Sequence, residues 1–95
     1  MKYEIKPSLK KILKKVLKKD KGFYEQVLTK IAEVVNSSDV EHYKNLRYSL
    51  KDFKRVHIGS FVLVFKFDKK NKIIYFEDLQ HHDTIYKNLW NVIKG

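Results

Sequence analysis

The stretch between residues 53 and 79 constrains the fold most, because nearly all of it has the composition of β-strands. Apolar side chains recur there in alternation or in short continuous runs, as is typical of strands. Gly59 and Ser60 interrupt the stretch where glycine allows the positive φ of a tight hairpin turn. Asp68 and Asn71 bound a second, polar turn. We therefore predict three strands in sequence order at 53–58, 61–67 and 73–79.

The first of these strands separates charged from apolar side chains. Arg55 and His57 lie on one face, whereas Val56 and Ile58 lie on the other. The third strand is apolar over its first four residues, as expected for a strand buried on both faces. A guanidinium and an imidazole on a rigid sheet are well placed to meet a ligand. The second strand divides into Phe61, Leu63, Phe65 and Phe67 on one face and Val62, Val64 and Lys66 on the other.

Two amphipathic helices precede the strands. The first is predicted to begin at Pro7 with Ser8 as its N-cap, and the second is capped by Asp20 and ends near Asn36. The short break between them predicts an antiparallel helix hairpin. The apolar positions of the first helix are Leu9, Ile12, Leu13, Val16 and Leu17. The second helix has two possible buried sides: Phe23, Val27, Ile31 and Val34, or Tyr24, Leu28, Ile31 and Val35.

Weaker patterns complete the order of elements. A short strand is expected at 3–5, a further strand at 43–50, and a last helix capped by Asp83, with Ile85 on its apolar side. The whole chain, 1–95, is thus expected to be one α+β domain. An N-terminal strand and a helix hairpin would pack on a small antiparallel sheet, followed by a C-terminal helix.

The net charge of +10 predicts attraction to polyanions, with nucleic acid first. Residues 1–21 hold nine lysines and two acidic residues, although such a surface can also simply be solvated. The chain lacks cysteine, a signal-like apolar start and any run long enough to span a membrane. We therefore expect a cytoplasmic protein without disulfides.

Histidines supply the candidate chemistry. His57 lies on a predicted strand, and His81 and His82 lie just after the neighbouring strand candidate, with Tyr86 one helical turn beyond His82. Antiparallel pairing of the strands could bring these histidines together over the sheet, close to Arg55 and Lys54. Metal-free RNA cleavage needs a base for the 2′-hydroxyl, an acid for the 5′-oxygen and a cation for the phosphorane. Imidazole suits the first two and Arg55 the third.

Structural roles are the alternatives for the same residues. His57 would then be a polar surface residue and Tyr86 a packing residue. His81 and His82 could hold a metal, but neither a third ligand at helical spacing nor a cysteine accompanies them, so we expect no metal and no other cofactor. Candidate contacts to RNA are Lys14, Lys18, Lys51, Lys54 and His81, with the lysines of the first helix holding the phosphate backbone.

In these segments the sequence resembles the RelE/ParE superfamily of type II toxins over nearly the whole chain. The resemblance rests on the first helix, IKPSLKKILKKVLK, and on Leu46 followed by RVHIG and an apolar strand. It also includes the closing His-x-x-x-Tyr, from His82 to Tyr86. Many members have an arginine at the positions of Val62 and His82, and the replacements are similar to the YafQ branch, in which histidines do the acid–base work.

The resemblance implies a ribosome-dependent, metal-independent endonuclease that cuts mRNA in the ribosomal A site. The implied site residues are Arg55, His57, His82 and Tyr86. His42 is a minor candidate, because it corresponds only loosely to a further histidine of the YafQ branch. The implied partner is an acidic, RelB-like antitoxin that forms a hetero-oligomer with the toxin. The alternatives are a ParE-like inhibitor of gyrase and a basic RNA-binding module without catalysis.

Overall fold

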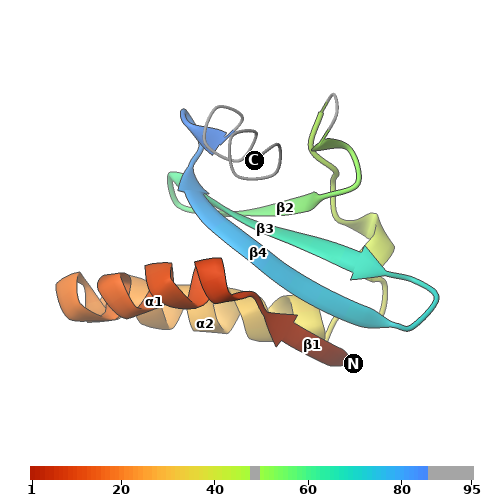
Figure 1. Cartoon of the computed structure of the whole chain (residues 1–95), viewed down its shortest axis with the longest axis horizontal. Helices are drawn as coiled ribbons and strands as arrows, with labels where there is room; N and C mark the ends of the chain where they lie inside the picture. Colours follow the sequence, from red (N-terminus) through yellow and green to blue (C-terminus); the bar gives the residue numbers. More distant parts are fainter. Residues whose placement is uncertain (48–49, 86–95) are drawn as a thin grey trace.

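The computed structural model describes residues 1–47 and 50–85, and within them an α+β fold (Figure 1). Two helices and four of the five predicted strands are present in this part of the chain. None of its helices is both long and apolar enough to cross a membrane. In chain order the elements are β1 (Lys2–Ile5), α1 (Pro7–Lys19), α2 (Lys21–Val35), the 3₁₀ helix η1 (Val40–His42), β2 (Lys54–Ile58), β3 (Phe61–Asp68) and β4 (Ile73–His81).

The four strands form one sheet in the order β1-β4-β3-β2. β2, β3 and β4 are antiparallel neighbours, whereas β1 pairs with β4 in parallel. The parallel pairing needs a long connection between the two strands, and this connection contains the helix hairpin as well as β2 and β3. The predicted hairpin turn is confirmed, because Gly59 adopts a φ of 60° between β2 and β3. β3 therefore lies between β2 and β4, so that the strand carrying His57 does not touch β4.

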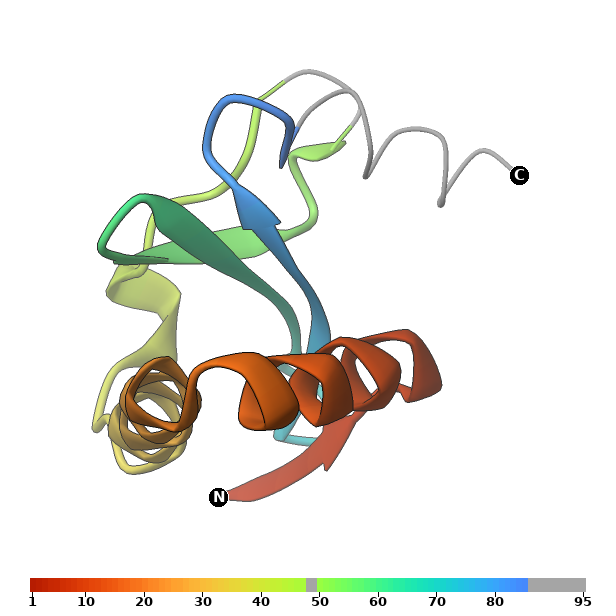
Figure 2. The same cartoon turned by 90° about the vertical axis from the view of Figure 1, so that its left-hand side faces the viewer.

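Both helices cover the same face of the sheet, which Figure 2 shows from the side. Between helices and sheet lies the main core, in which the rings of Phe65 and Phe76 are 5.8 Å apart. Of the two buried sides proposed for α2, the first is confirmed, because Leu28 is 38% exposed. The side chains of α1 and α2 that are buried in this core are Leu9, Leu13, Val27, Ile31 and Val34.

One of the two predicted helix caps is confirmed and the other is wrong. The Asp20 carboxylate accepts a hydrogen bond from the Phe23 N–H at 3.0 Å and so caps α2. The N-cap of α1 is Lys6, whose side chain makes no capping bond, and Pro7 is the first helical residue. The hydroxyl of Ser8 instead donates to the Glu77 carbonyl at 3.0 Å and ties α1 to β4. The hydroxyl of Ser8 therefore makes a tertiary hydrogen bond to β4 in place of the predicted capping bond within α1.

The strand predicted at 43–50 is wrong over its described residues. After η1 the chain makes a single bridge, between Asn45 and Lys54, and then turns. Leu46 and Leu50 are nonetheless buried, because they pack with Ile85 on the sheet face opposite the helices. We call this packing the second core; its buried residues are Leu46, Leu50, Val62, Val64 and Ile85. Apart from its first residues, the predicted last helix lies outside the described residues.

A bulge in β4 sets which side chains share the second face. Val64 pairs with Asp78 but its neighbour Phe65 pairs with Phe76, so Glu77 is an extra residue in β4. Asp78 thereby joins the face that carries Val64. The bulge turns an acidic residue toward the side of the sheet where Arg55 and His57 project.

Candidate functional site

Arg55 and His57 form a direct pair on β2. The two residues are separated by one position, so both project from the face opposite the helices, as predicted. Nη1 of Arg55 lies 2.9 Å from Nε2 of His57. Because a guanidinium can only donate, Nε2 accepts and the imidazole carries its proton on Nδ1. The His57 side chain is exposed, so a solvent-borne ligand can reach the pair.

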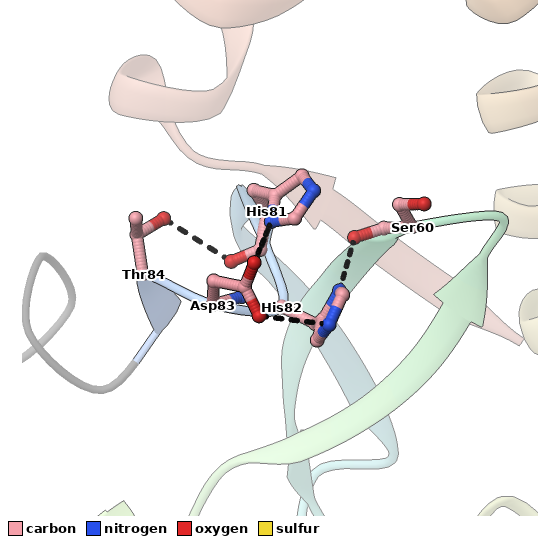
Figure 3. Close-up of polar contacts among 5 residues, drawn as sticks. All are labelled: Ser60, His81, His82, Asp83 and Thr84. Atoms are coloured by element: carbon pink, nitrogen blue, oxygen red, sulfur yellow. Dashed lines mark hydrogen bonds and ion pairs between the residues drawn. The ribbon is translucent and has the colours of Figure 1, made fainter.

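His81, His82 and Asp83 form a second polar cluster at the end of β4, which we call the HHD cluster (Figure 3). Nε2 of His82 lies 2.9 Å from the Asp83 carboxylate, and Nδ1 of His81 lies 3.5 Å from its other oxygen. The two imidazoles stack with centroids 4.7 Å apart. An extended segment would send neighbouring side chains to opposite faces, but here the chain turns and both rings meet the same carboxylate.

The turn between β2 and β3 holds the HHD cluster in place. The Ser60 carbonyl accepts both the His82 main-chain N–H at 3.0 Å and Nδ1 of its ring at 3.1 Å. The ring of His81 packs edge-on against Phe61, with centroids 5.5 Å apart. Phe61 and His81 are direct partners in the β3–β4 register. The cluster is thus fixed by the register of the sheet.

The two groups of histidines lie near the same end of the sheet but do not touch. Since β3 separates β2 from β4, the backbones of His57 and His82 are two strand spacings apart, about 10 Å. No hydrogen bond or ring contact joins the two residues in the described part of the chain. The prediction that strand pairing would bring them together is therefore wrong in its simplest form, because β2 and β4 are not neighbours.

Sequence reasoning missed Asp78, which is the buried acidic residue of this sheet face. It is 5% exposed, and its carboxylate accepts hydrogen bonds from the Leu79 N–H at 2.9 Å and from the Gln80 amide. Burial raises the pKa of the Asp78 carboxyl above its ordinary value, although these hydrogen bonds partly offset that effect. Arg55, Val64 and Asp78 follow one another across three strands. These three residues line up because of the bulge in β4, which could not be predicted from the sequence.

The remaining predicted residues are spread over the molecule. Lys54 lies on the other face of β2, where its Nζ donates to the Glu41 and Tyr43 carbonyls and to the Asn45 side chain at 2.9–3.2 Å. This ammonium holds the segment before β2 in place. Three more lysines are exposed, with Lys51 in the turn before β2 and Lys14 and Lys18 on α1 in the helix layer.

The described part of the chain links neither Tyr86 nor His42 to the other candidate site residues. Tyr86 lies outside the described residues. Nδ1 of His42 contacts the Asp39 carbonyl at the other end of the same 3₁₀ turn. That contact gives the ring a local partner and no link to the other histidines.

Comparison with known proteins establishes the family. No family model matches the sequence. The chain is 54% identical over 85 residues to a protein of Methanocaldococcus jannaschii named "Putative toxin RelE4", with 88% of each chain covered. This chain belongs to the RelE family of toxins. The resemblance predicted from the sequence is thereby confirmed, and the chain is a type II toxin of that family.

Solved structures agree with this RelE-family fold. A YafQ mutant from E. coli has a TM-score of 0.68 at 18% identity, over 88% of this chain and 96% of that one. A chain of the toxin-antitoxin complex RelBE2 from Mycobacterium tuberculosis has a TM-score of 0.58 at 14% identity, over 85% and 96% of the two chains. At these identities the likeness shows the fold, which confirms the predicted α+β, RelE-like architecture.

Proposed function

We propose that this RelE-family toxin is a ribosome-dependent endoribonuclease that cleaves mRNA in the A site by attack of the 2′-hydroxyl. The observation that carries the proposal is the Arg55–His57 pair, which places a cation in contact with a neutral imidazole on an exposed strand. Phosphodiester cleavage needs these two groups together, because one accepts a proton while the other stabilises charge on phosphorus. The net charge of +10 favours the approach of RNA.

We assign the role of base to His57. Its Nε2 lone pair accepts from Arg55 in the free toxin, so this nitrogen is the one held unprotonated. When Arg55 turns to a phosphate, to which a guanidinium binds strongly, the lone pair becomes free for the 2′-hydroxyl. Binding of the RNA phosphate to Arg55 would therefore also free His57 to act as the base.

We assign the role of acid to His82. Both of its ring nitrogens face oxygen acceptors, Ser60 O at 3.1 Å and the Asp83 carboxylate at 2.9 Å. Both contacts are hydrogen bonds only when the ring is doubly protonated, which is the form that can give a proton to the leaving 5′-oxygen. Tyr86 is a further candidate from the sequence, in addition to His82.

The separation of the two histidines explains why a ribosome would be needed. A base and an acid must each come within about 3 Å of their oxygen atoms. His57 and His82 stand two strand spacings apart, so a flexible RNA would rarely lie in line across both of them. A substrate held in an extended shape by the ribosome would meet that condition, since fixed orientation replaces a costly search.

We further propose an acidic, RelB-like antitoxin as partner, with which the toxin forms a hetero-oligomer. The RelBE2 structure from Mycobacterium tuberculosis is a toxin-antitoxin complex. In this chain Tyr3 on β1, Leu17 on α1 and Leu28 on α2 are large apolar side chains that remain 38–49% exposed. Leu17 and Leu28 line one hollow together with Lys10 and Lys14. A partner with apolar and acidic residues would cover them, and such a protein should restore growth when it is expressed together with the toxin.

The test of the nuclease is primer extension on a reporter mRNA in a purified translation system, with and without ribosomes. Cleavage is expected only with ribosomes, and His57→Ala and His82→Ala should each reduce its rate by about 10²-fold or more. His42→Ala is the matched control, because this histidine has only a local contact. Wild-type activity in the His57→Ala, His82→Ala double variant would refute the site.

The gyrase-inhibitor alternative predicts a different result. Intact mRNA in both conditions, together with impaired supercoiling of plasmid DNA by gyrase, would select a ParE-like activity. Intact mRNA and normal supercoiling would leave RNA binding without catalysis, which a filter-binding assay would detect.

A further inference from the structure

We propose that the HHD cluster is a binding site for a borderline first-row divalent ion such as Zn²⁺. His81, His82 and Asp83 each offer a ligand atom, and these atoms all lie within 4.8 Å of one another. In the described part of the chain this is the one group of three or more such side chains close enough to share an ion. No third ligand for a metal beside His81 and His82 could be identified from the sequence. Asp83, which we had expected to cap a helix, provides that third ligand in the structure.

The two distances from the Asp83 carboxylate to the imidazoles are close to those between ligand atoms of a zinc ion, and the ligand atoms of the cluster all lie within 4.8 Å of one another. With bonds of about 2.0–2.1 Å, the ligand atoms around a tetrahedral zinc ion lie about 3.4 Å apart. The Asp83 oxygens are 2.9 Å from Nε2 of His82 and 3.5 Å from Nδ1 of His81. Small rotations of side chains that are 40–70% exposed would place all three around one ion, with water completing the sphere.

The Ser60 carbonyl gives His82 the orientation that metal-binding histidines have. A ligating imidazole usually donates its second N–H to a carbonyl or carboxylate, which fixes the tautomer and turns the other nitrogen to the ion. Nδ1 of His82 faces Ser60 O at 3.1 Å, so Nε2 is the nitrogen that points to Asp83 (Figure 3). Packing of His81 against Phe61 restrains the second ring.

One contact must yield when the ion binds through Nδ1 of His81. The Asp83 main-chain N–H donates to that nitrogen at 3.2 Å. This hydrogen bond is exposed, so water can replace it on the N–H at small cost. The ligating nitrogens must also be unprotonated, so protons compete with the ion for the site.

Occupancy of this site would inhibit the toxin, an inference that rests on the proposed function of His82. An ion bound to Nε2 takes the nitrogen that must carry a proton to the leaving group. The site would therefore act as an inhibitory metal switch, separate from the metal-free reaction itself.

Binding is tested by titrating ZnCl₂ into the untagged full chain in a calorimeter. One equivalent of Zn²⁺ is expected to bind, and His81→Gln and Asp83→Asn should each weaken the affinity by tenfold or more. His42→Gln is the matched control, since it removes a histidine outside the cluster. Circular dichroism of each variant confirms that it folds. Equal affinity in the wild type, His81→Gln and Asp83→Asn, or no saturable binding, would overturn the site.

Inhibition is tested in the ribosome assay at increasing Zn²⁺, with EDTA to reverse it. For each variant the cleavage rate with Zn²⁺ is divided by its own rate without metal, so that basal differences cancel. The wild type should lose tenfold or more, whereas Asp83→Asn should lose little. Cleavage that is unaffected by saturating Zn²⁺ would overturn the inhibitory role. If the toxin cleaves nothing, the proposed nuclease fails, but the calorimetric result still decides the metal site.

Discussion

Arg55 donates a hydrogen bond from its Nη1 to Nε2 of His57 over 2.9 Å, between two residues that share one face of β2. The contact joins the strongest phosphate-binding side chain to the side chain best suited to proton transfer near neutral pH. Arg55 is half-buried and His57 is exposed, so the pair is accessible, and it is held by β2, the edge strand of the sheet.

We expect Arg55→Gln to reduce ribosome-dependent cleavage by about 10²–10³-fold, the usual effect of removing a donor that stabilises charge in the transition state. The substitution keeps a polar side chain but removes the charge. The loss should lie in the rate of cleavage at saturating ribosomes, measured by primer extension. Thermal unfolding should change little, because a polar pair at the surface contributes little to stability.

Lys70→Gln is the control for the change of net charge. Lys70 is exposed in the turn between β3 and β4, at the opposite end of β3 from Gly59. If Lys70→Gln and Arg55→Gln reduce cleavage equally, Arg55 acts only through the overall charge of the toxin.

Local patterns predicted the elements that form from local forces. Arg55 and His57 could be placed on one face because alternation along a strand is set by the backbone alone. Asp20 could be identified as a cap because its partner lies three residues away. Such features need no knowledge of the rest of the chain.

Features that depend on distant partners could not be predicted in this way. Leu46 and Leu50 alternate like a strand, but their burial comes from covering Val64, which lies in a different element. The contact from His82 to Ser60 spans 22 residues and follows from the β3–β4 register. Asp78 reaches its face only because Glu77 bulges, and no composition signals that bulge.

Gly59→Ala should destabilise the fold by about 1–2 kcal/mol, because an L-residue at a φ of 60° meets its own carbonyl. A Cβ at Gly59 would have no neighbouring atom within 4 Å, so the effect is one of backbone strain alone. Urea unfolding measures it. Gly22→Ala, in α2, should instead stabilise the fold by up to about 1 kcal/mol. A stability loss at Gly22 equal to that at Gly59 would contradict this explanation.

Leu50→Ala should destabilise the fold by about 2–5 kcal/mol, because it removes from the second core a side chain that is only 2% exposed. Leu17→Ala is the matched control: Leu17 is 43% exposed, and its loss should cost less than about 0.5 kcal/mol. The measurement is the urea midpoint at constant m-value. Equal effects of the two substitutions would mean that the segment before β2 does not cover the sheet.

Asp78→Asn should become increasingly stabilising relative to the wild type as the pH rises. Burial raises the pKa of Asp78 in the folded state above that in the unfolded chain. Between the two pKa values the folded state binds more protons, so the wild type loses stability as the pH rises through this window. Each unit of difference between the two pKa values corresponds to about 1.4 kcal/mol.

The amide of Asp78→Asn does not ionise, so the Asn variant avoids this loss while its oxygen can still accept the Leu79 N–H. Urea unfolding of both proteins at a series of pH values from 3 to 8 measures the difference between their free energies of unfolding. That difference should shift steadily in favour of Asn up to the folded-state pKa and then stay constant. A difference that is independent of pH would show that folding leaves the pKa of Asp78 unchanged. A difference that shifts toward Asp would show that Asp78 is stabilised as a carboxylate in the folded toxin, for instance by Arg55 across the row that the two residues share with Val64.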